Sequence, residues 1–180
     1  MSLKTVRSGV ERRVRRLVFH CPVSALLTGA GVLMAAGAIV RFVSGSPYSH
    51  GMMVQLGHIL PSTPMMSLLW MIWYGLLGAS FAATLVLARK LSPVGCAEIY
   101  RGGMLFLTMI FLGYVWYPLF FAAGHIWLAT VVLLGVLALC ILTAICYIRL
   151  CRMAGIVLFC HAAWLVWLCV VSVRILFGIF

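Results

Sequence analysis

The chain has 180 residues, of which 66% are hydrophobic and only 8% are charged. Soluble domains carry about 25% charged residues, so this composition excludes an ordinary soluble fold, and the same apolar excess excludes disorder. Thirteen basic residues against two acidic ones give a formal net charge of +11. The basic residues stand between apolar stretches of roughly 20 residues, which is typical of an integral membrane protein and does not indicate a nucleic-acid-binding protein.

The chain begins with a basic arm, residues 1–21, and continues into five apolar segments. Each segment is long enough for a helix that crosses a hydrocarbon core of roughly 30 Å. The sequence therefore predicts an all-α integral membrane protein, a five-transmembrane-helix bundle that forms one domain over residues 22–180. The predicted spans are 22–43, 65–88, 102–124, 126–148 and 153–176. The length of the first apolar run and the four runs after it disfavour the alternative of a cleaved signal peptide.

The basic residues also predict an orientation. With the N-terminus in the cytoplasm, eleven of them fall on the inner side: Lys4, Arg7, Arg12, Arg13, Arg15, Arg16, Arg89, Lys90, Arg101, Arg149 and Arg152. Only Arg41 and Arg174 are left outside, at span ends where their side chains can reach the interface. We therefore expect a cytoplasmic N-terminus and an external C-terminus, and a bacterial cytoplasmic membrane suits this charge pattern best.

Conventional catalytic and metal-binding groups are not visible in the sequence. No predicted span contains Asp or Glu, no nucleophile stands with a base, and the seven cysteines form no CxxC pair. This pattern predicts no metal site and no required cofactor. His161 is the one histidine deep in a span, and no second histidine matches its depth, which disfavours haem held between two histidines. A hydrogen-bonded interior histidine and a polar contact to a ligand both remain open for His161.

The six tryptophans are the residues that point to a binding function: Trp70, Trp73, Trp116, Trp127, Trp164 and Trp167. At a rise of about 1.5 Å per residue all of them fall in the outer half of the bilayer. An interfacial aromatic belt or plain core packing would explain part of this pattern. The alternative is a ligand cavity lined by indoles, which would suit a flat, largely apolar ligand. The loop 44–64, rich in Gly and Pro, would then be a lid above the cavity, although an ordinary solvated loop fits equally well.

Small residues predict close helix contacts. Gly75, Ala79 and Ala83 lie on one face of the second span, and Gly31 and Ala35 lie on one face of the first. Such faces suit close packing either inside the bundle or between two copies in a homodimer.

Three stretches of sequence carry a resemblance to a known family. They are the run from Pro61 to Gly78, PSTPMMSLLWMIWYGLLG, the run from Trp116 to Phe121, WYPLFF, and the run from His161 to Trp164, HAAW. In this order they resemble the tryptophan-rich sensory protein, or translocator protein, family over residues 22 to 176. The five spans and the long first loop agree with that family.

The resemblance implies a membrane protein that binds porphyrins, haem precursors or sterol-like molecules beneath the first loop, for sensing, sequestration or transport. It implies that Trp70 and Trp164 correspond to paired pocket tryptophans, tied in bacterial members to porphyrin breakdown. Porphyrin or haem would be a ligand and not a required cofactor. The expected ligand-binding residues are Pro61, Trp70, Tyr74, Trp116, Phe120, His161, Trp164 and Trp167.

This chain departs from the family pattern at polar positions. Gly113 stands where an Asn is usual, Cys160 and His161 replace a Pro-Tyr pair, and Ser172 replaces an Asn. A sterol-type pattern, Leu142-x4-Tyr147-x-Arg149, occurs at the inner end of the fourth span, where an ordinary interface anchor explains it as well. Two other functions stay open: a haem-carrying membrane redox protein that uses His161, and a non-catalytic structural subunit.

Overall fold

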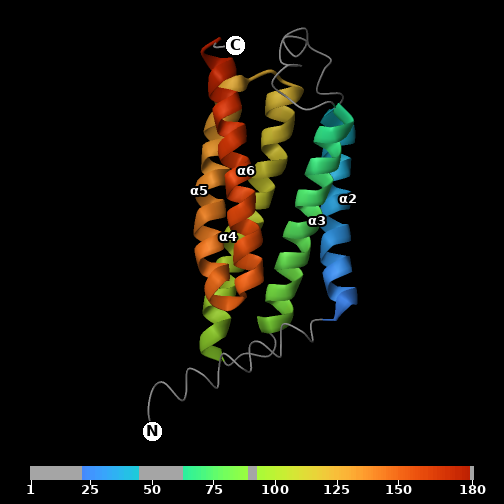
Figure 1. Ribbon diagram of the computed structural model, residues 1–180, viewed down its shortest axis with the longest axis vertical. Helices are drawn as coiled ribbons and strands as arrows, with labels where there is room; N and C mark the ends of the chain where they lie inside the picture. Colours follow the sequence, from blue (N-terminus) through green and yellow to red (C-terminus); the bar gives the residue numbers. More distant parts are fainter. Residues whose placement is uncertain (1–21, 45–62, 89–92, 179–180) are drawn as a thin grey trace.

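The structure is a computed structural model, and it describes residues 22–44, 63–88 and 93–178. In these ranges the chain forms five helices: α2 (Val23–Ser44), α3 (Thr63–Ala88), α4 (Pro93–Phe121), α5 (Ile126–Leu150) and α6 (Arg152–Leu176) (Figure 1). All five are long and apolar enough to cross a membrane, which confirms the predicted five-helix membrane bundle. The basic arm 1–21 and the loop positions 45–62, including Pro61, lie outside the described residues.

Successive helices run in opposite directions (Figure 1). The C-terminal end of α6 lies at the same end as the turn 122–125 between α4 and α5. Cys151, the one residue between α5 and α6, lies at the opposite end. This alternation is what short connections between membrane-crossing helices produce.

Helix α4 is shifted from its predicted span of 102–124. It starts at Pro93 and ends at Phe121. Its early start has a simple cause: proline suits the first turn of a helix, and a helix need not stop where its apolar stretch does. At the other end, Gly124 has a φ of +65°, a left-handed conformation that ends the helical path before α5 begins.

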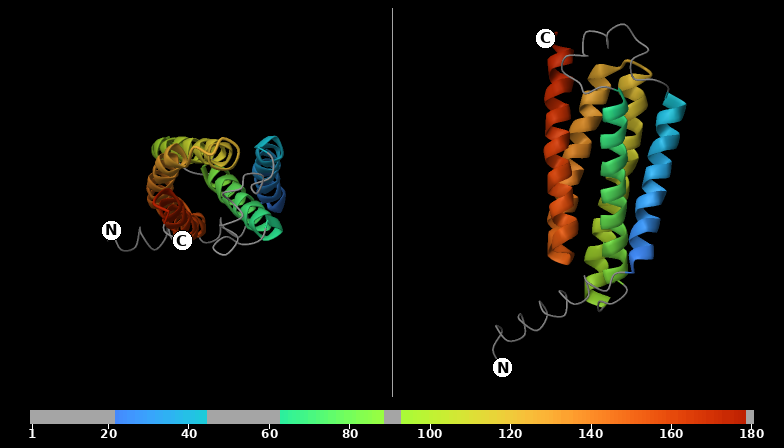
Figure 2. Two further views of the ribbon diagram at one scale, coloured as in Figure 1. Left: turned by 90° about the horizontal axis from the view of Figure 1, so that it is seen from above. Right: turned by 45° about the vertical axis from the view of Figure 1, so that its right-hand side comes forward.

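The helices associate in two groups. Helix α2 packs mainly on α3, whereas α5 packs on both α4 and α6; α3 contacts α4, α5 and α6 less extensively. Seen from above, α4, α5 and α6 form an arc beside the α2–α3 pair (Figure 2). The seam between the two groups is where the candidate site lies.

The contact between α2 and α3 depends on two glycines. A Cβ atom on Gly29 would lie 2.5 Å from the carbonyl oxygen of Gly78, and a Cβ on Gly78 would collide with the backbone of Gly29. The two backbones therefore meet with no side chain between them, as close helix pairs in membranes do. Gly75 also faces α2, because a Cβ there would lie 3.1 Å from the sulfur of Met34.

The small residues predicted for the first span lie elsewhere. Gly31 and Ala35 are on the exposed face of α2, and a Cβ on Gly31 would meet nothing within 4 Å. Of the two alternatives for this pair, packing inside the bundle does not hold, because Gly29, two residues earlier, occupies the contacting face. A contact between two copies of the chain through the Gly31–Ala35 face stays a prediction.

Candidate ligand-binding site

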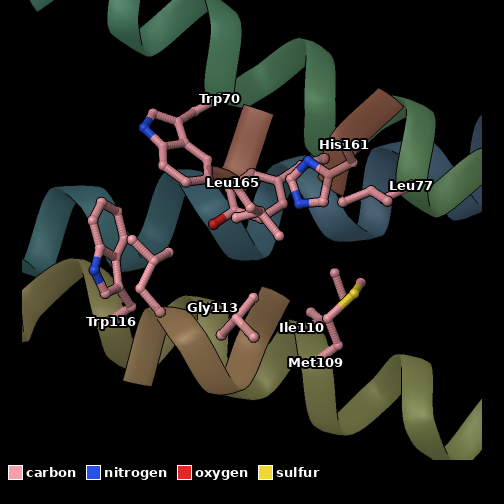
Figure 3. Close-up of a pocket in the computed structure, with 11 residues that line it drawn as sticks. Trp70, Leu77, Met109, Ile110, Gly113, Trp116, His161 and Leu165 are labelled. Carbon is pink, nitrogen blue, oxygen red and sulfur yellow. The ribbon is translucent and has the colours of Figure 1, made fainter. Parts of the chain in front are cut away.

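A small cavity lies on the seam, with walls from four helices (Figure 3). Helix α3 supplies Trp70, Tyr74 and Leu77, and α6 supplies His161 and Leu165. Helices α4 and α5 complete the wall with Met109, Ile110, Gly113, Trp116, Leu133 and Val136. Its volume is about 20 Å³. That is room for about one water molecule.

Helical spacing brings these residues to the cavity. The α3 residues are separated by four and three positions, and so are Met109, Gly113 and Trp116 on α4. Residues at this spacing share one helix face. The lining is therefore one stripe from each helix, and Figure 3 shows the α3 and α4 stripes facing each other across the cavity.

Indole rings from three helices meet beside the cavity. The rings of Trp70 on α3 and Trp116 on α4 have centroids 5.7 Å apart. Trp164 on α6 meets Trp70 edge-on, at 6.4 Å and an interplanar angle of 84°. These distances are those of favourable aromatic contacts. The three tryptophans therefore share one layer, as their depth along the spans predicts.

Two further predicted residues stand behind this cluster. Phe120 stacks on Trp116 with a centroid distance of 5.2 Å, and Trp167 stacks on Trp164 at 4.8 Å. Neither they nor Trp164 line the cavity in this conformation. Trp127 is 66% exposed and takes no part in the cluster. Its position at the start of α5 is the one that fits an interfacial belt.

Four buried nitrogen atoms of the site have no hydrogen-bond partner among the described residues. The indole Nε1 atoms of Trp70, Trp116 and Trp164 are buried and make no hydrogen bond to any described residue. The Nδ1 atom of His161 is also buried and makes no hydrogen bond to any described residue. Buried polar atoms are normally paired, and tryptophans with free N–H groups inside a protein are unusual. The hydrogen-bonded interior histidine considered above therefore finds no support among the described residues.

His161 lies close to a tryptophan that was not among the predicted site residues. The ring centroids of Trp73 and His161 are 5.0 Å apart. Trp73 is half-buried on α3 and His161 is buried on α6, so this contact crosses the seam between the two helix groups. The signal in the sequence was the spacing: Trp73 lies three residues after Trp70 and one before Tyr74, so it flanks the same stripe.

Helix α2 supports the site from behind. The ring of Tyr74 packs on Gly37, where a Cβ would lie 2.5 Å from a ring carbon. Tyr74 also contacts Tyr114 with a centroid distance of 5.0 Å, and the Tyr114 hydroxyl donates a hydrogen bond of 2.9 Å to the carbonyl oxygen of Leu33 on α2. Gly37 and this bond fix the position of Tyr74 in the wall.

The sterol-type pattern is only partly accessible, because its tyrosine is turned into the bundle. Tyr147 is fully buried, with its ring stacked against Phe106 at a centroid distance of 6.0 Å, while Leu142 is 50% exposed. The two side chains therefore cannot both contact one molecule that binds from the lipid side. The interpretation of Tyr147 as an interface anchor is also wrong, because its ring fills the core between α4 and α5.

The predicted site residues thus fall into three sets. Trp70, Tyr74, Trp116 and His161 line the cavity; Phe120, Trp164 and Trp167 pack behind these residues; and Pro61 lies outside the described residues. The sequence reasoning missed the apolar wall, for which helical spacing from the aromatic residues was the available signal. In the described part of the chain no three His, Cys, Asp or Glu side chains gather to hold a metal ion.

These features define an integral membrane protein, a bundle of five helices with an aromatic cavity between two helix groups. The chain belongs to the TspO/MBR family, whose sequence model matches residues 22–177. Comparisons with curated proteins and with solved structures give no match.

Proposed function

We propose that this protein binds a flat, largely apolar ligand on the seam between α3 and α4–α6, and that this ligand is a porphyrin or a related tetrapyrrole. One observation carries the proposal: Trp70, Trp116 and Trp164 come from three helices and meet beside one cavity, and their buried N–H groups have no partner among the described residues. Indole faces stack on flat rings, and free N–H groups supply contacts that orient a ligand.

The ligand requires more room than this conformation offers. A cavity of about 20 Å³ holds roughly one water molecule, so a macrocycle must separate side chains that now touch. Helix α3 is the element best placed to move, because it is packed tightly on α2 and less extensively on α4, α5 and α6. The α2–α3 pair would shift as one body, since Gly29 and Gly78 hold its backbones together.

A tetrapyrrole fits this site better than a sterol does. The saturated rings of a sterol cannot stack on indoles, and its one hydroxyl would leave most of the free nitrogen atoms unpaired. A tetrapyrrole offers a planar aromatic face together with ring nitrogens and carboxylates. The described sterol-type pattern gives no competing site, because Tyr147 is buried.

The role that we propose is sensing, sequestration or transport of this ligand. The membrane-spanning part of α4, Ile99–Phe121, contains no acidic residue, and neither do the other four spans. Coupling to an ion gradient through an intramembrane carboxylate therefore has no support here. Turnover of a porphyrin by the contacting pair Trp70 and Trp164 stays a prediction from the family resemblance.

Fluorescence titration tests the proposal. Protoporphyrin IX added to the purified protein in detergent should quench tryptophan emission saturably, with a stoichiometry of one ligand per chain. A cholesterol analogue should not displace it. Linear, non-saturating quenching would contradict the proposal. Copurification with a stoichiometric partner protein and no response to porphyrin would favour the structural-subunit alternative instead.

We further propose that the N-terminus is cytoplasmic, that the C-terminus is external and that the membrane is the bacterial cytoplasmic membrane. The support is the distribution of basic residues: Arg149 and Arg152 flank the α5–α6 connection, and Arg101 stands near the same end of the bundle, in the first turn of the α4 span. A C-terminal alkaline phosphatase fusion expressed in bacteria should be active and a C-terminal green fluorescent protein fusion should be dark. The reverse result would contradict the orientation.

A further inference from the structure

His161 lines the cavity and carries an unpaired polar atom. The residue is only 4% exposed, it lies in the middle of α6, and its Nδ1 atom is buried without a hydrogen-bond partner among the described residues. Buried polar atoms are normally paired with protein or with ordered water, and leaving one unpaired is costly. The ring of His161 therefore needs a partner that no described residue supplies.

The cavity beside His161 has the size of one small molecule. Its volume is about 20 Å³. A cavity needs roughly 10–15 Å³ to hold one water molecule, and a buried water has about two to four polar partners. Purely apolar cavities stay dry, whereas a cavity with polar groups in its wall holds water. In this conformation the cavity is large enough for one water and too small for an organic ligand.

Tyr74 supplies a second polar group to the same wall. It lines the cavity from α3, whereas His161 lines it from α6. A tyrosine hydroxyl both donates and accepts hydrogen bonds, and a neutral imidazole has one donor and one acceptor nitrogen. A water molecule also donates and accepts, so it can bond to both groups whichever histidine nitrogen carries the proton.

We propose that the cavity is a binding site for one water molecule, which bridges the ring of His161 on α6 and the hydroxyl of Tyr74 on α3. The bridge crosses the seam beside the ring contact between Trp73 and His161 and holds α3 against α6. The water belongs to the conformation described here and does not depend on the ligand proposed above, which would have to displace it.

Gly113 keeps this space open. It lines the cavity from α4, and a Cβ atom built on it would meet nothing within 4 Å. Figure 3 shows Gly113 on the α4 wall and His161 projecting toward that wall from α6. Glycine inside a helix is less stable than alanine, and no close contact at Gly113 requires it. A methyl group at this position would take volume that the water needs.

A crystal structure of the full-length protein without added ligand, at a resolution that shows ordered waters, tests the site directly. One water should lie about 2.7–3.2 Å from a ring nitrogen of His161 and a similar distance from the hydroxyl oxygen of Tyr74. A cavity without water density would overturn the proposal, and so would a water that bonds to neither side chain.

Gly113→Ala tests the site in solution, with Gly135→Ala as its matched control. Gly135 on α5 also has open space at its Cβ but does not line the cavity. Because Gly113→Ala expels the water, it should unfold in detergent about 2–4 °C below Gly135→Ala. In a His161→Leu background the difference should shrink to near zero, since the water has already lost a partner there. Equal Tm values for the two alanine variants would overturn the proposal. A difference that persists in His161→Leu would do the same, because it would indicate a steric cost.

Discussion

Trp70 and Trp116 lie 46 positions apart in the chain, yet their ring centroids are 5.7 Å apart across the seam between α3 and α4. This contact joins the α2–α3 pair to the α4–α6 group at the level of the cavity. Both indole N–H groups are buried, and neither has a hydrogen-bond partner in the part of the chain that the structure describes. At this level the seam is closed by aromatic contact, which a flat ligand can replace with its own faces. One hydrogen bond also crosses the seam, from the Tyr114 hydroxyl on α4 to the carbonyl oxygen of Leu33 on α2.

Gly113→Leu should fill the cavity from the α4 side. A Cβ at this position meets nothing within 4 Å, so the side chain starts without a clash, and its remaining atoms take the space that a ligand would use. We expect porphyrin affinity to fall by at least about tenfold, which corresponds to about 1.4 kcal/mol. The measurement is the dissociation constant from fluorescence quenching.

Gly135→Leu is the control for this substitution. Gly135 on α5 also has open space at its Cβ, but it does not line the cavity. Its affinity for porphyrin should match that of the wild type. Equal losses in the two variants would mean that the cavity is not where the ligand binds.

Gly37→Ala should destabilise the bundle near the site. The added Cβ would lie 2.5 Å from the ring of Tyr74, so either the ring or α2 has to move. Overpacking of this kind costs about 1–3 kcal/mol. Thermal unfolding in detergent, followed by tryptophan fluorescence, should show a lower Tm.

Gly31→Ala provides the matched comparison on the same helix. Gly31 is exposed with nothing near its Cβ, so alanine should leave the Tm unchanged or raise it slightly. A Gly31→Ala variant that unfolds earlier than Gly37→Ala would show that the α2–α3 contact is arranged differently.

Tyr114→Phe should weaken the link between α4 and α2. It removes the 2.9 Å hydrogen bond to the carbonyl oxygen of Leu33 and leaves the ring contact with Tyr74 in place. The expected loss is about 0.5–1.5 kcal/mol in the free energy of unfolding. Tyr100→Phe, at a position that is 69% exposed, should cost nothing measurable. Equal behaviour of the two variants would remove the role assigned to this bond.

Composition and hydropathy predict the fold well because a bilayer imposes length and apolar character on every span. They miss where helices continue beyond the bilayer, as α4 does from Pro93. They also cannot tell which face of an apolar helix meets protein. Gly29 and Gly31 are the same residue type in the same apolar stretch, and only the packing shows that Gly29 is the one in contact with α3. In a soluble protein the polar face would have marked the difference, but lipid and core are equally apolar.

The aromatic half of the site was predictable for a different reason. Depth along each span is a simple count of residues, and it places Trp70, Trp116 and Trp164 at one level before any contact is known. Rotation about each helix axis is what the count omits. That is why Trp164 and Trp167 were expected to line the cavity, whereas they pack behind Trp70, and why Trp73 beside His161 was overlooked.

The central claim is that Trp70, Trp116 and Trp164 form the surface that binds a tetrapyrrole. The most direct measurement is the dissociation constant of protoporphyrin IX for Trp70→Phe/Trp164→Phe, set beside Trp127→Phe, whose indole is exposed at the start of α5. Base-stacking indoles contribute about 1–3 kcal/mol each in other proteins, so the double variant should bind at least about tenfold more weakly while Trp127→Phe binds as the wild type does. Wild-type affinity in the double variant would contradict the account.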